Sequence, residues 1–296
     1  MKTFLECIPC FIKQTFDAAS MSTSDTVLQE KILRRVLAEA ADISFSQSPP
    51  EMARYIHGII RKETGVTDPY RELKHLYNKK ALDLYPVMKE YVTQSAEPLR
   101  TAVNLAIIGN IIDFGVQRDD HEIHVEREIS ENMNRTPGVN HLDELSASVE
   151  KAEQILYIGD NTGEIVFDRV LIETMGPERI TFAVRSAPII NDVTMSDAQD
   201  VGITRLCTVI ESGSDGPGTI MELCTHEFKN EFENADLVIS KGQGNYETLS
   251  GISRNDLYFL LKAKCPVIAR DISCDVGDFI VMKAGADKGG MDDGIK

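Results

Sequence analysis

The sequence predicts an α/β protein in which an all-helical N-terminal region precedes a Rossmann-like, mainly parallel sheet. From residue 155 onward, short apolar runs alternate with segments of helical periodicity, a pattern typical of right-handed βαβ crossovers. Before residue 154 the periodicity is helical, and no convincing strand is found. We therefore expect a helical region over residues 1–150, the Rossmann-like domain over 151–285 and an unstructured tail over 286–296.

Six apolar runs are expected to form the strands of this sheet. They cover residues 155–158, 180–184, 206–210, 237–240, 266–269 and, as an edge strand, 279–282. Each run is short and is bounded by polar or glycine-containing segments, as expected for buried strands.

Composition excludes several classes of protein. The formal charge of −16 argues against a broad basic surface for nucleic acid or an anionic membrane. No apolar run approaches the roughly 20 residues that span a bilayer, and the N-terminus does not resemble a signal peptide. We expect a cytoplasmic protein whose six cysteines are reduced.

Four polar loops follow four of the predicted strands, at residues 159–164, 185–192, 211–218 and 241–247. Ligands of open parallel sheets bind beyond the carboxyl ends of the strands. The sequence therefore predicts a binding site where these loops meet.

The first loop contains Asp160 and Asn161, and Glu164 follows at the start of the next helix. Carboxylate and amide oxygens suit a hard divalent ion such as Mg²⁺ or Mn²⁺. The alternative is an ordinary turn, since Asp and Asn also favour turns and helix caps.

The second loop can bring a further carboxylate, Asp192, to the same crevice, together with Arg185 and Ser186. Asp192 could equally be the N-cap of a helix starting at Val193. Both interpretations remain open from the sequence.

The third loop is rich in glycine, and the N–H groups near Gly213 and Gly216 would suit a phosphate if the loop led into a long helix. The alternative is a flexible connection.

In the fourth loop, Lys241 directly follows a buried strand and could neutralise a phosphoryl oxygen, with Asn245 nearby. A lysine at a strand end is more often only solvated.

Asn110 lies on the apolar stripe of a predicted helix around residues 99–114, with Asp113 beside it. A buried amide is costly unless it is hydrogen-bonded, so this helix is expected to face the active-site crevice. The alternative is an asparagine whose hydrogen bonds are satisfied within the core.

Near the N-terminus, Cys7 and Cys10 could hold zinc only with further ligands, for which Cys274 and His57 are the candidates.

Five segments together resemble the DUF89 family of damage-control phosphatases with an ARMT1-like metal-binding domain, and its shorter prokaryotic branch in particular. These segments cover residues 7–10, 109–115, 159–164, 191–194 and 241–245. They span nearly the whole chain in the expected order.

This resemblance implies an α/β/α domain and one divalent metal ion (Mn, Co, Ni or Mg) bound by Asp160, Asn161 and Asp192. It also implies that Lys241 contacts phosphate and that Asn110 lines the pocket. The implied activity is hydrolysis of phosphate monoesters of small metabolites, either sugar phosphates or damaged phosphometabolites.

The resulting hypothesis is metal-assisted hydrolysis in which Glu164 or Asp192 takes a proton from water. Asp160, Glu164, Asp192 and Lys241 are then the expected catalytic residues. The substrate would be contacted by Asn110, Asp113, Arg185, Ser186, Gly213, Gly216, Lys241 and Asn245. Two alternatives are an S-adenosylmethionine-dependent carboxyl methyltransferase and a non-catalytic module for metals or metabolites. No nucleic-acid or membrane partner is expected, and the oligomeric state is not predicted.

Overall fold

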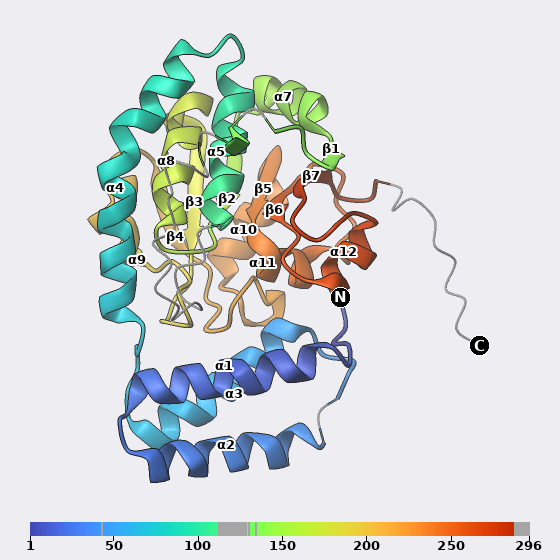
Figure 1. Ribbon diagram of the computed structural model, residues 1–296. Helices are drawn as coiled ribbons and strands as arrows, with labels where there is room; N and C mark the ends of the chain where they lie inside the picture. The colour runs from blue at the N-terminus through green and yellow to red at the C-terminus, as the bar shows by residue number, and fades with distance from the viewer. Residues whose placement is uncertain (43, 112–128, 130, 134, 287–296) are drawn as a thin grey trace, which may run out of the picture.

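The computed structural model describes residues 1–42, 44–111, 129, 131–133 and 135–286. Within this part of the chain, one seven-stranded sheet has the order β1-β7-β6-β5-β2-β3-β4 (Figure 1). All neighbouring strands are parallel except β6 and β7. The strands are β1 Val139–Asn140, β2 Ile155–Ile158, β3 Ile180–Val184, β4 Thr208–Glu211, β5 Leu237–Lys241, β6 Leu257–Lys262 and β7 Phe279–Lys283.

One of the expected strands is wrong. Residues 266–269 begin helix α12, Pro266–Ile272, and the strand of this region is β6, which the apolar pattern did not identify. Pro266 stands at the first helical position, where its fixed φ favours a helix start, and a run of four apolar residues is compatible with either structure. Strand β7 is also not an edge, because it pairs with both β1 and β6.

Helices cover both faces of the sheet, which confirms the expected α/β fold (Figure 1). Successive residues of β2 point to opposite faces, so Tyr157 joins one hydrophobic core and Leu156 the other. The first core includes α4 Arg71–Gln94, α5 Pro98–Ile111, α7 Leu142–Lys151, α8 Glu164–Met175 and α9 Met195–Asp200. The second includes α10 His226–Asn234, α11 Gly242–Leu249 and α12. Helices α4, α5 and α7 thus pack on the sheet although they precede residue 152.

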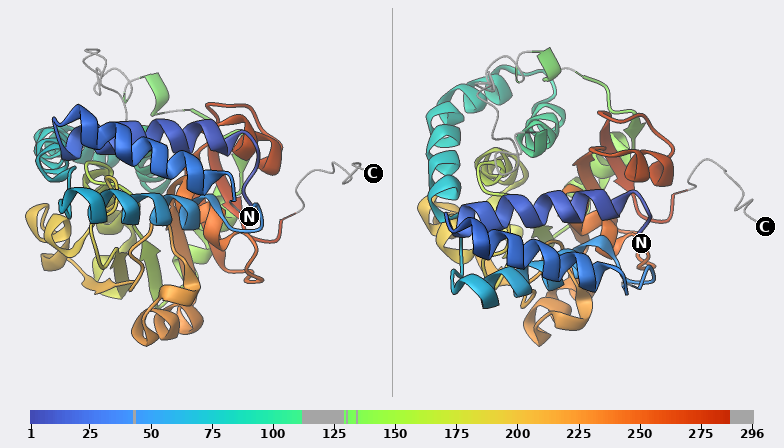
Figure 2. Two further views of the ribbon diagram at one scale, coloured as in Figure 1. Left: turned by 90° about the horizontal axis from the view of Figure 1, so that it is seen from below. Right: turned by 60° about the horizontal axis from the view of Figure 1, so that its bottom comes forward.

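Helices α1 Cys7–Ser22, α2 Thr26–Ala40 and α3 Pro49–Thr64 form a separate layer, which we call the helical layer. It has its own core around Phe11, Ile32 and Ile56. Helix α3 starts sharply because Ser48 and Glu51 form a capping box and Pro49 occupies the first turn. Figure 2 shows this layer lying across one end of the sheet.

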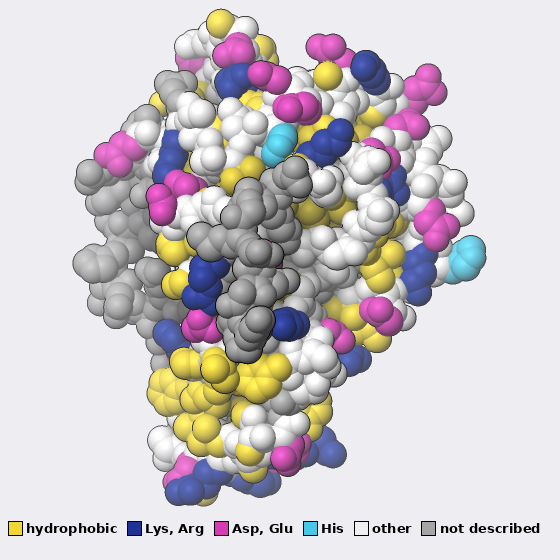
Figure 3. All heavy atoms as spheres, turned by 90° about the vertical axis from the view of Figure 1, so that its right-hand side faces the viewer, with side chains coloured by type: hydrophobic (Ala, Val, Ile, Leu, Met, Phe, Trp, Pro, Cys, Tyr) yellow, Lys and Arg dark blue, Asp and Glu magenta, His cyan; other side chains and the backbone are white. Residues whose placement is uncertain are grey.

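Part of the surface is hydrophobic, although the chain carries a high net negative charge. Figure 3 shows hydrophobic side chains gathered on the lower part of one face, at the level of the helical layer. Leu5, Phe16 and Val27 are among the exposed large hydrophobic residues of this part of the chain. Within the described ranges, no helix combines the length and the apolar character needed to cross a membrane.

Candidate active site

The loops that follow β2 and β3 are joined by backbone hydrogen bonds at the end of the sheet. Thr162 N donates to Asn191 O at 2.9 Å, Val193 N donates to Asp160 O at 2.9 Å, and Asn161 and Asp192 form an isolated β-bridge. This pairing holds Asp160, Asn161 and Asp192 side by side. The three residues are 7%, 9% and 3% exposed, and all of them line the same cleft.

Asp192 is not a helix cap. Helix α9 begins at Met195, and its N-cap is Thr194, which forms a capping box with Asp197. The carboxylate of Asp192 instead accepts a hydrogen bond from Arg185 Nε at 2.8 Å. Its side chain is therefore positioned by the site and not by the helix that follows.

Two asparagine amides connect the carboxylates of Asp160 and Glu164. Asn110 Nδ2 lies 3.0 Å from Asp160 Oδ2 and 2.9 Å from Glu164 Oε2. Asn161 Nδ2 donates to the same two oxygens at 2.7 and 3.2 Å. Asn110 is thus a satisfied buried amide, as the alternative supposed, but its partners are site carboxylates. These bonds use the side-chain nitrogen of Asn161. Its side-chain carbonyl oxygen is the atom of this amide that could bind a metal ion.

The electrostatics of this cluster favour a bound cation. Burial, followed by the charges of Glu164 and Asp192, raises the pKa of Asp160 well above its usual value. Burial also raises the pKa of Asp192, although the Arg185 guanidinium opposes this effect. A nearby positive ion would favour the charged carboxylates and relieve their mutual repulsion.

The donor set fits a hard divalent ion, which prefers oxygen ligands. Among the described residues, no group of three or more His, Cys, Asp and Glu side chains is arranged to hold a metal ion. The amide oxygen of Asn161 is therefore needed to complete the set of Asp160 and Asp192. Space for Asp160 is provided by Gly242, where a Cβ atom would lie 1.7 Å from Asp160 Oδ2.

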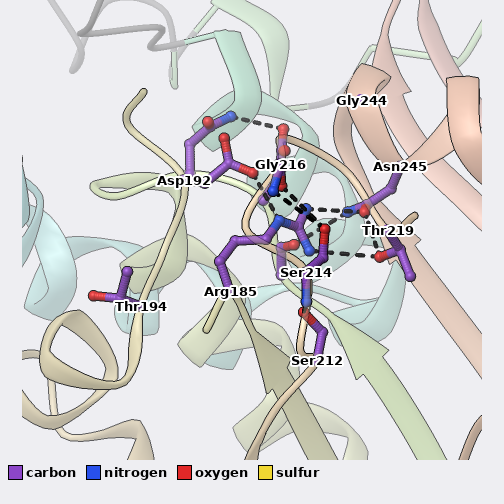
Figure 4. A network of polar contacts seen from close by, with 12 residues as sticks. Arg185, Asp192, Thr194, Ser212, Ser214, Gly216, Thr219, Gly244 and Asn245 are labelled. Carbon is purple, nitrogen blue, oxygen red and sulfur yellow. Dashed lines mark hydrogen bonds and ion pairs between the residues drawn. The ribbon is translucent and has the colours of Figure 1, made fainter. Parts of the chain in front are cut away.

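Arg185 links Asp192 to Asn245 in a network of polar contacts (Figure 4). Arg185 and Asn245 are both fully buried, and neither lines the cleft. Arg185 Nη2 donates to Asn245 Oδ1 at 2.9 Å, and Asn245 Nδ2 donates to the main-chain oxygens of Gly159 and Lys241 at 3.1 and 2.7 Å. Two residues expected to contact substrate are thus placed in the supporting network.

Lys241 also lies beneath the site. Its ammonium group is fully buried and lies 2.5 Å from both Glu164 Oε1 and Asp168 Oδ1, and 3.0 Å from Ala106 O. Burial would lower the pKa of Lys241, but the carboxylates of Asp168 and Glu164 outweigh it and raise the pKa. Burial raises the pKa of Asp168 to about 7 despite the attraction of Lys241. Asp168, which also accepts a hydrogen bond from Tyr157 at 2.7 Å, was not identified from the sequence.

The glycine-rich third loop uses its N–H groups internally. Gly213 N donates to Ser186 Oγ at 2.6 Å, and Gly216 N donates to Ser214 Oγ at 3.3 Å. The long helix expected directly after this loop is wrong, because a 3-10 turn at Met221–Leu223 comes first and α10 begins only at His226. The fourth segment, in contrast, is not a loop but a helix, since α11 starts at Gly242 directly after β5.

The cleft in front of the candidate ligands lies between the helical layer and the sheet and has a volume of about 300 Å³. Its walls include Lys264, Gln243 and Glu247, none of which was selected from the sequence. The positive charge of Lys264 opposes the rise in the pKa of Asp160 that burial and the neighbouring carboxylates cause. Lys264 follows β6, which is parallel to β5, so the rule of strand ends would have found it had β6 been recognised.

Cys7 and Cys10 also line the cleft, together with Cys265. Burial raises the pKa of both Cys7 and Cys10. Neither candidate zinc ligand joins them: Cys274 does not line the cleft, and His57 is buried in α3 with a pKa lowered to about 4 by desolvation. Of the expected site residues, Asp113 lies outside the described residues.

A mainly parallel sheet with an acidic, amide-rich site at its carboxyl edge, covered by a helical layer, defines a Rossmann-like protein with a small-ligand site. The family model of the damage-control phosphatase ARMT1-like domain matches residues 3–280, and the chain belongs to this family.

Archaeal relatives match over nearly their whole length. A damage-control phosphatase of Pyrococcus horikoshii is 34% identical, covering 96% of this chain and 98% of that protein. A damage-control phosphatase of Archaeoglobus fulgidus is 33% identical, with coverages of 95% and 98%. An uncharacterized protein of Methanocaldococcus jannaschii is 37% identical, with 94% of each chain covered. The crystal structure of a DUF89 family protein from Pyrococcus horikoshii has a TM-score of 0.88 at 33% identity, covering 96% of this chain and 99% of the other.

Proposed function

We propose that this protein is a divalent-metal-dependent phosphatase that hydrolyses phosphate monoesters of small metabolites, including damaged phosphometabolites. The observation that carries this proposal is the buried set of Asp160, Asn161 and Asp192 facing a cleft of about 300 Å³. Two relatives that match over nearly the whole chain are named damage-control phosphatases, which supports the same activity.

Asp160, Asp192 and the amide oxygen of Asn161 would hold one ion, either Mn²⁺, Co²⁺, Ni²⁺ or Mg²⁺. When bound, such an ion polarises a phosphoryl oxygen and neutralises charge that develops during hydrolysis. Hydrogen bonds from the amides of Asn110 and Asn161 orient Asp160. Arg185 holds Asp192 in the same way, so the ligands are placed before the substrate arrives.

Two lysines would have separate roles. Lys264 lines the cleft and would bind the phosphate. Lys241 would hold the side chains of Glu164 and Asp168 in place beneath the site through two buried ion pairs. Glu164 does not line the cleft, so its part would be to hold Asn110, Asn161 and Lys241. Asp192 would accept the proton of the attacking water, because this residue lines the cleft and Glu164 does not.

Hydrolysis of p-nitrophenyl phosphate tests this proposal. Purified protein should be active with Mn²⁺ or Co²⁺ and inactive after treatment with EDTA. Asp160→Ala should lower kcat/KM by more than the roughly 10–100-fold that loss of a supporting group costs at metal sites. Full activity of Asp160→Ala in the presence of EDTA would contradict the proposal.

Calorimetry separates the alternatives. A methyltransferase would bind S-adenosylmethionine, whereas the proposed phosphatase would not. A non-catalytic module would bind Mn²⁺ without turnover of any phosphate ester.

A further inference from the structure

The first turns of helix α11 present hydrogen-bond acceptors to the cleft. Gln243 Nε2 donates to Glu247 Oε1 at 2.9 Å and contacts Cys265 Sγ at 3.8 Å, which fixes the orientation of the amide. The other amide atom, Gln243 Oε1, is buried and has no hydrogen-bond partner among the described residues. We call Gln243 Oε1 and the Glu247 carboxylate the acceptor corner. A buried acceptor without a partner is costly. A hydrogen-bond donor on a bound ligand would supply the partner that Gln243 Oε1 lacks.

The charges around the cleft are unevenly distributed. Lys264 is close enough to Asp160 for its positive charge to oppose the raised pKa of that carboxylate. Glu247 is only 8% exposed, and its negative charge contributes to the raised pKa values of Cys7 and Cys10. The amino group of Met1 lies nearby and opposes the effect of burial, which nevertheless raises the pKa of Glu247 to about 7.

Glu6 also lines the cleft, but its carboxylate is paired with Arg270 at 2.6 Å. Glu247 has no ion pair with a Lys or Arg side chain in the described part of the chain. An anionic group placed beside Glu247 would therefore meet a like charge in a poorly solvated corner, whereas an ammonium or hydroxyl group would gain a hydrogen bond.

The remaining walls restrict the size of the ligand. They include apolar side chains of the helical layer and of α12: Phe11, Pro49, Pro50, Ala53 and Val267. A volume of about 300 Å³ is at the small end of the range for small-molecule sites. The cleft therefore suits a phosphate ester whose body is no larger than about one sugar ring.

We propose that Gln243 and Glu247 bind hydroxyl or ammonium groups on the body of the substrate, so that the enzyme selects monophosphates with a neutral or cationic body. This inference rests on the proposed phosphatase function and adds a substrate class to it. A second anionic group on the substrate is disfavoured because Lys264, the one lysine among the described residues that line the cleft, lies toward the metal ligands.

The test compares three six-carbon phosphate esters at pH 7.5 with Mn²⁺: glucosamine 6-phosphate, glucose 6-phosphate and 6-phosphogluconate. Each kcat/KM is divided by that for p-nitrophenyl phosphate, whose body carries no hydrogen-bond donor. We expect the ratios to fall in the order cationic, neutral, anionic, with at least about a tenfold difference between the first and the last.

Substitutions of Glu247 and Gln243 test whether the acceptor corner causes this order of substrates. Glu247→Gln keeps the shape and removes the charge, so the ratios for glucosamine 6-phosphate and 6-phosphogluconate should move toward that for glucose 6-phosphate. Gln243→Met should lower the ratio for glucose 6-phosphate several-fold, and it provides a second test if Glu247→Gln does not fold. The matched control is Glu6→Gln, which should leave the order of the three substrates unchanged.

Equal ratios for the three substrates in the unmodified enzyme would overturn the inference. The same order in Glu247→Gln as in the unmodified enzyme would also overturn it, while leaving the phosphatase function intact. Absence of turnover for every ester, including p-nitrophenyl phosphate, would contradict the proposed function and this inference with it.

Discussion

Lys241 is the last residue of β5 and Lys264 follows the neighbouring strand β6, yet their surroundings differ. Lys241 is fully buried between Glu164 and Asp168, whereas Lys264 is partly exposed and lines the cleft. The buried ammonium group of Lys241 compensates the charge of the two carboxylates beside it. Its loss would leave an unpaired charge in the interior, which is strongly unfavourable. A partly exposed lysine can meet a substrate at little cost to the fold.

Substitution of the two lysines by methionine should separate these roles. Lys241→Met should lower the free energy of unfolding by about 3–5 kcal/mol, because Glu164 and Asp168 lose their buried partner. Lys264→Met should change the free energy of unfolding by less than about 1 kcal/mol, but should lower kcat/KM for p-nitrophenyl phosphate by about 100–1000-fold. Urea unfolding and steady-state kinetics measure the two quantities. Equal stabilities of the two variants would contradict this assignment.

Strand β5 passes into helix α11 without a connecting loop, and this junction shapes the site. Gly242, the first residue of α11, has a φ of 78°, a value that favours glycine. The missing side chain also admits the carboxylate of Asp160, which a Cβ atom at Gly242 would contact at 1.7 Å. The strand–helix junction and the candidate metal ligand therefore depend on the same residue.

Gly242→Ala should displace Asp160 and weaken the apparent affinity for Mn²⁺ by at least about tenfold, with a parallel loss of phosphatase activity. The control is Gly58→Ala in helix α3, where no atom beyond the adjacent backbone of the same helix lies within 4 Å of the added Cβ. This control should stabilise the protein by about 0.5–1 kcal/mol, because alanine is the better helix former. Mn²⁺ titration and thermal unfolding check both outcomes. Unchanged Mn²⁺ affinity in Gly242→Ala would show that Asp160 does not depend on this space.

The cleft is formed by two units that pack against each other. The helical layer has a core of its own, and it contacts the site loops through Arg61, which donates to Pro188 O at 3.1 Å, and through an ion pair between Arg54 and Asp215. Ile190, which lies two positions before the candidate metal ligand Asp192, also packs against this core. Loosening of the layer should therefore disturb the cleft before it disturbs the sheet.

Ile32→Ala tests this coupling from a distance. Ile32 is fully buried in α2 and belongs to the core of the helical layer. The cavity should cost about 2–5 kcal/mol and raise amide hydrogen exchange in α1–α3 well above that in β2 and β5. Activity should be lost at a lower temperature than the secondary structure of the sheet. The control Ile172→Ala, in α8, should instead speed exchange in the strands. Uniform exchange in Ile32→Ala would show that the two units unfold together.

The strands at residues 155–158, 180–184 and 237–240 could be predicted because each is a buried apolar run between loop signals. Their parallel arrangement then indicated that Asp160, Asn161 and Asp192 would meet. Strand β6 and helix α12 could not be separated in this way, because short apolar runs suit both structures. The missed strand concealed Lys264, which follows it.

Local pattern was thus enough to show which polar residues stand at the strand ends. Whether Lys241, Arg185 and Asn245 face the cleft or support it from beneath depends on burial, and burial depends on packing between distant segments. Arg61 and Pro188 are 127 positions apart, and Arg54 and Asp215 are 161 apart. Contacts between such distant residues leave no periodic pattern in the sequence. Which residues face the ligand and which support the site is therefore decided only by the packing of the helical layer against the sheet.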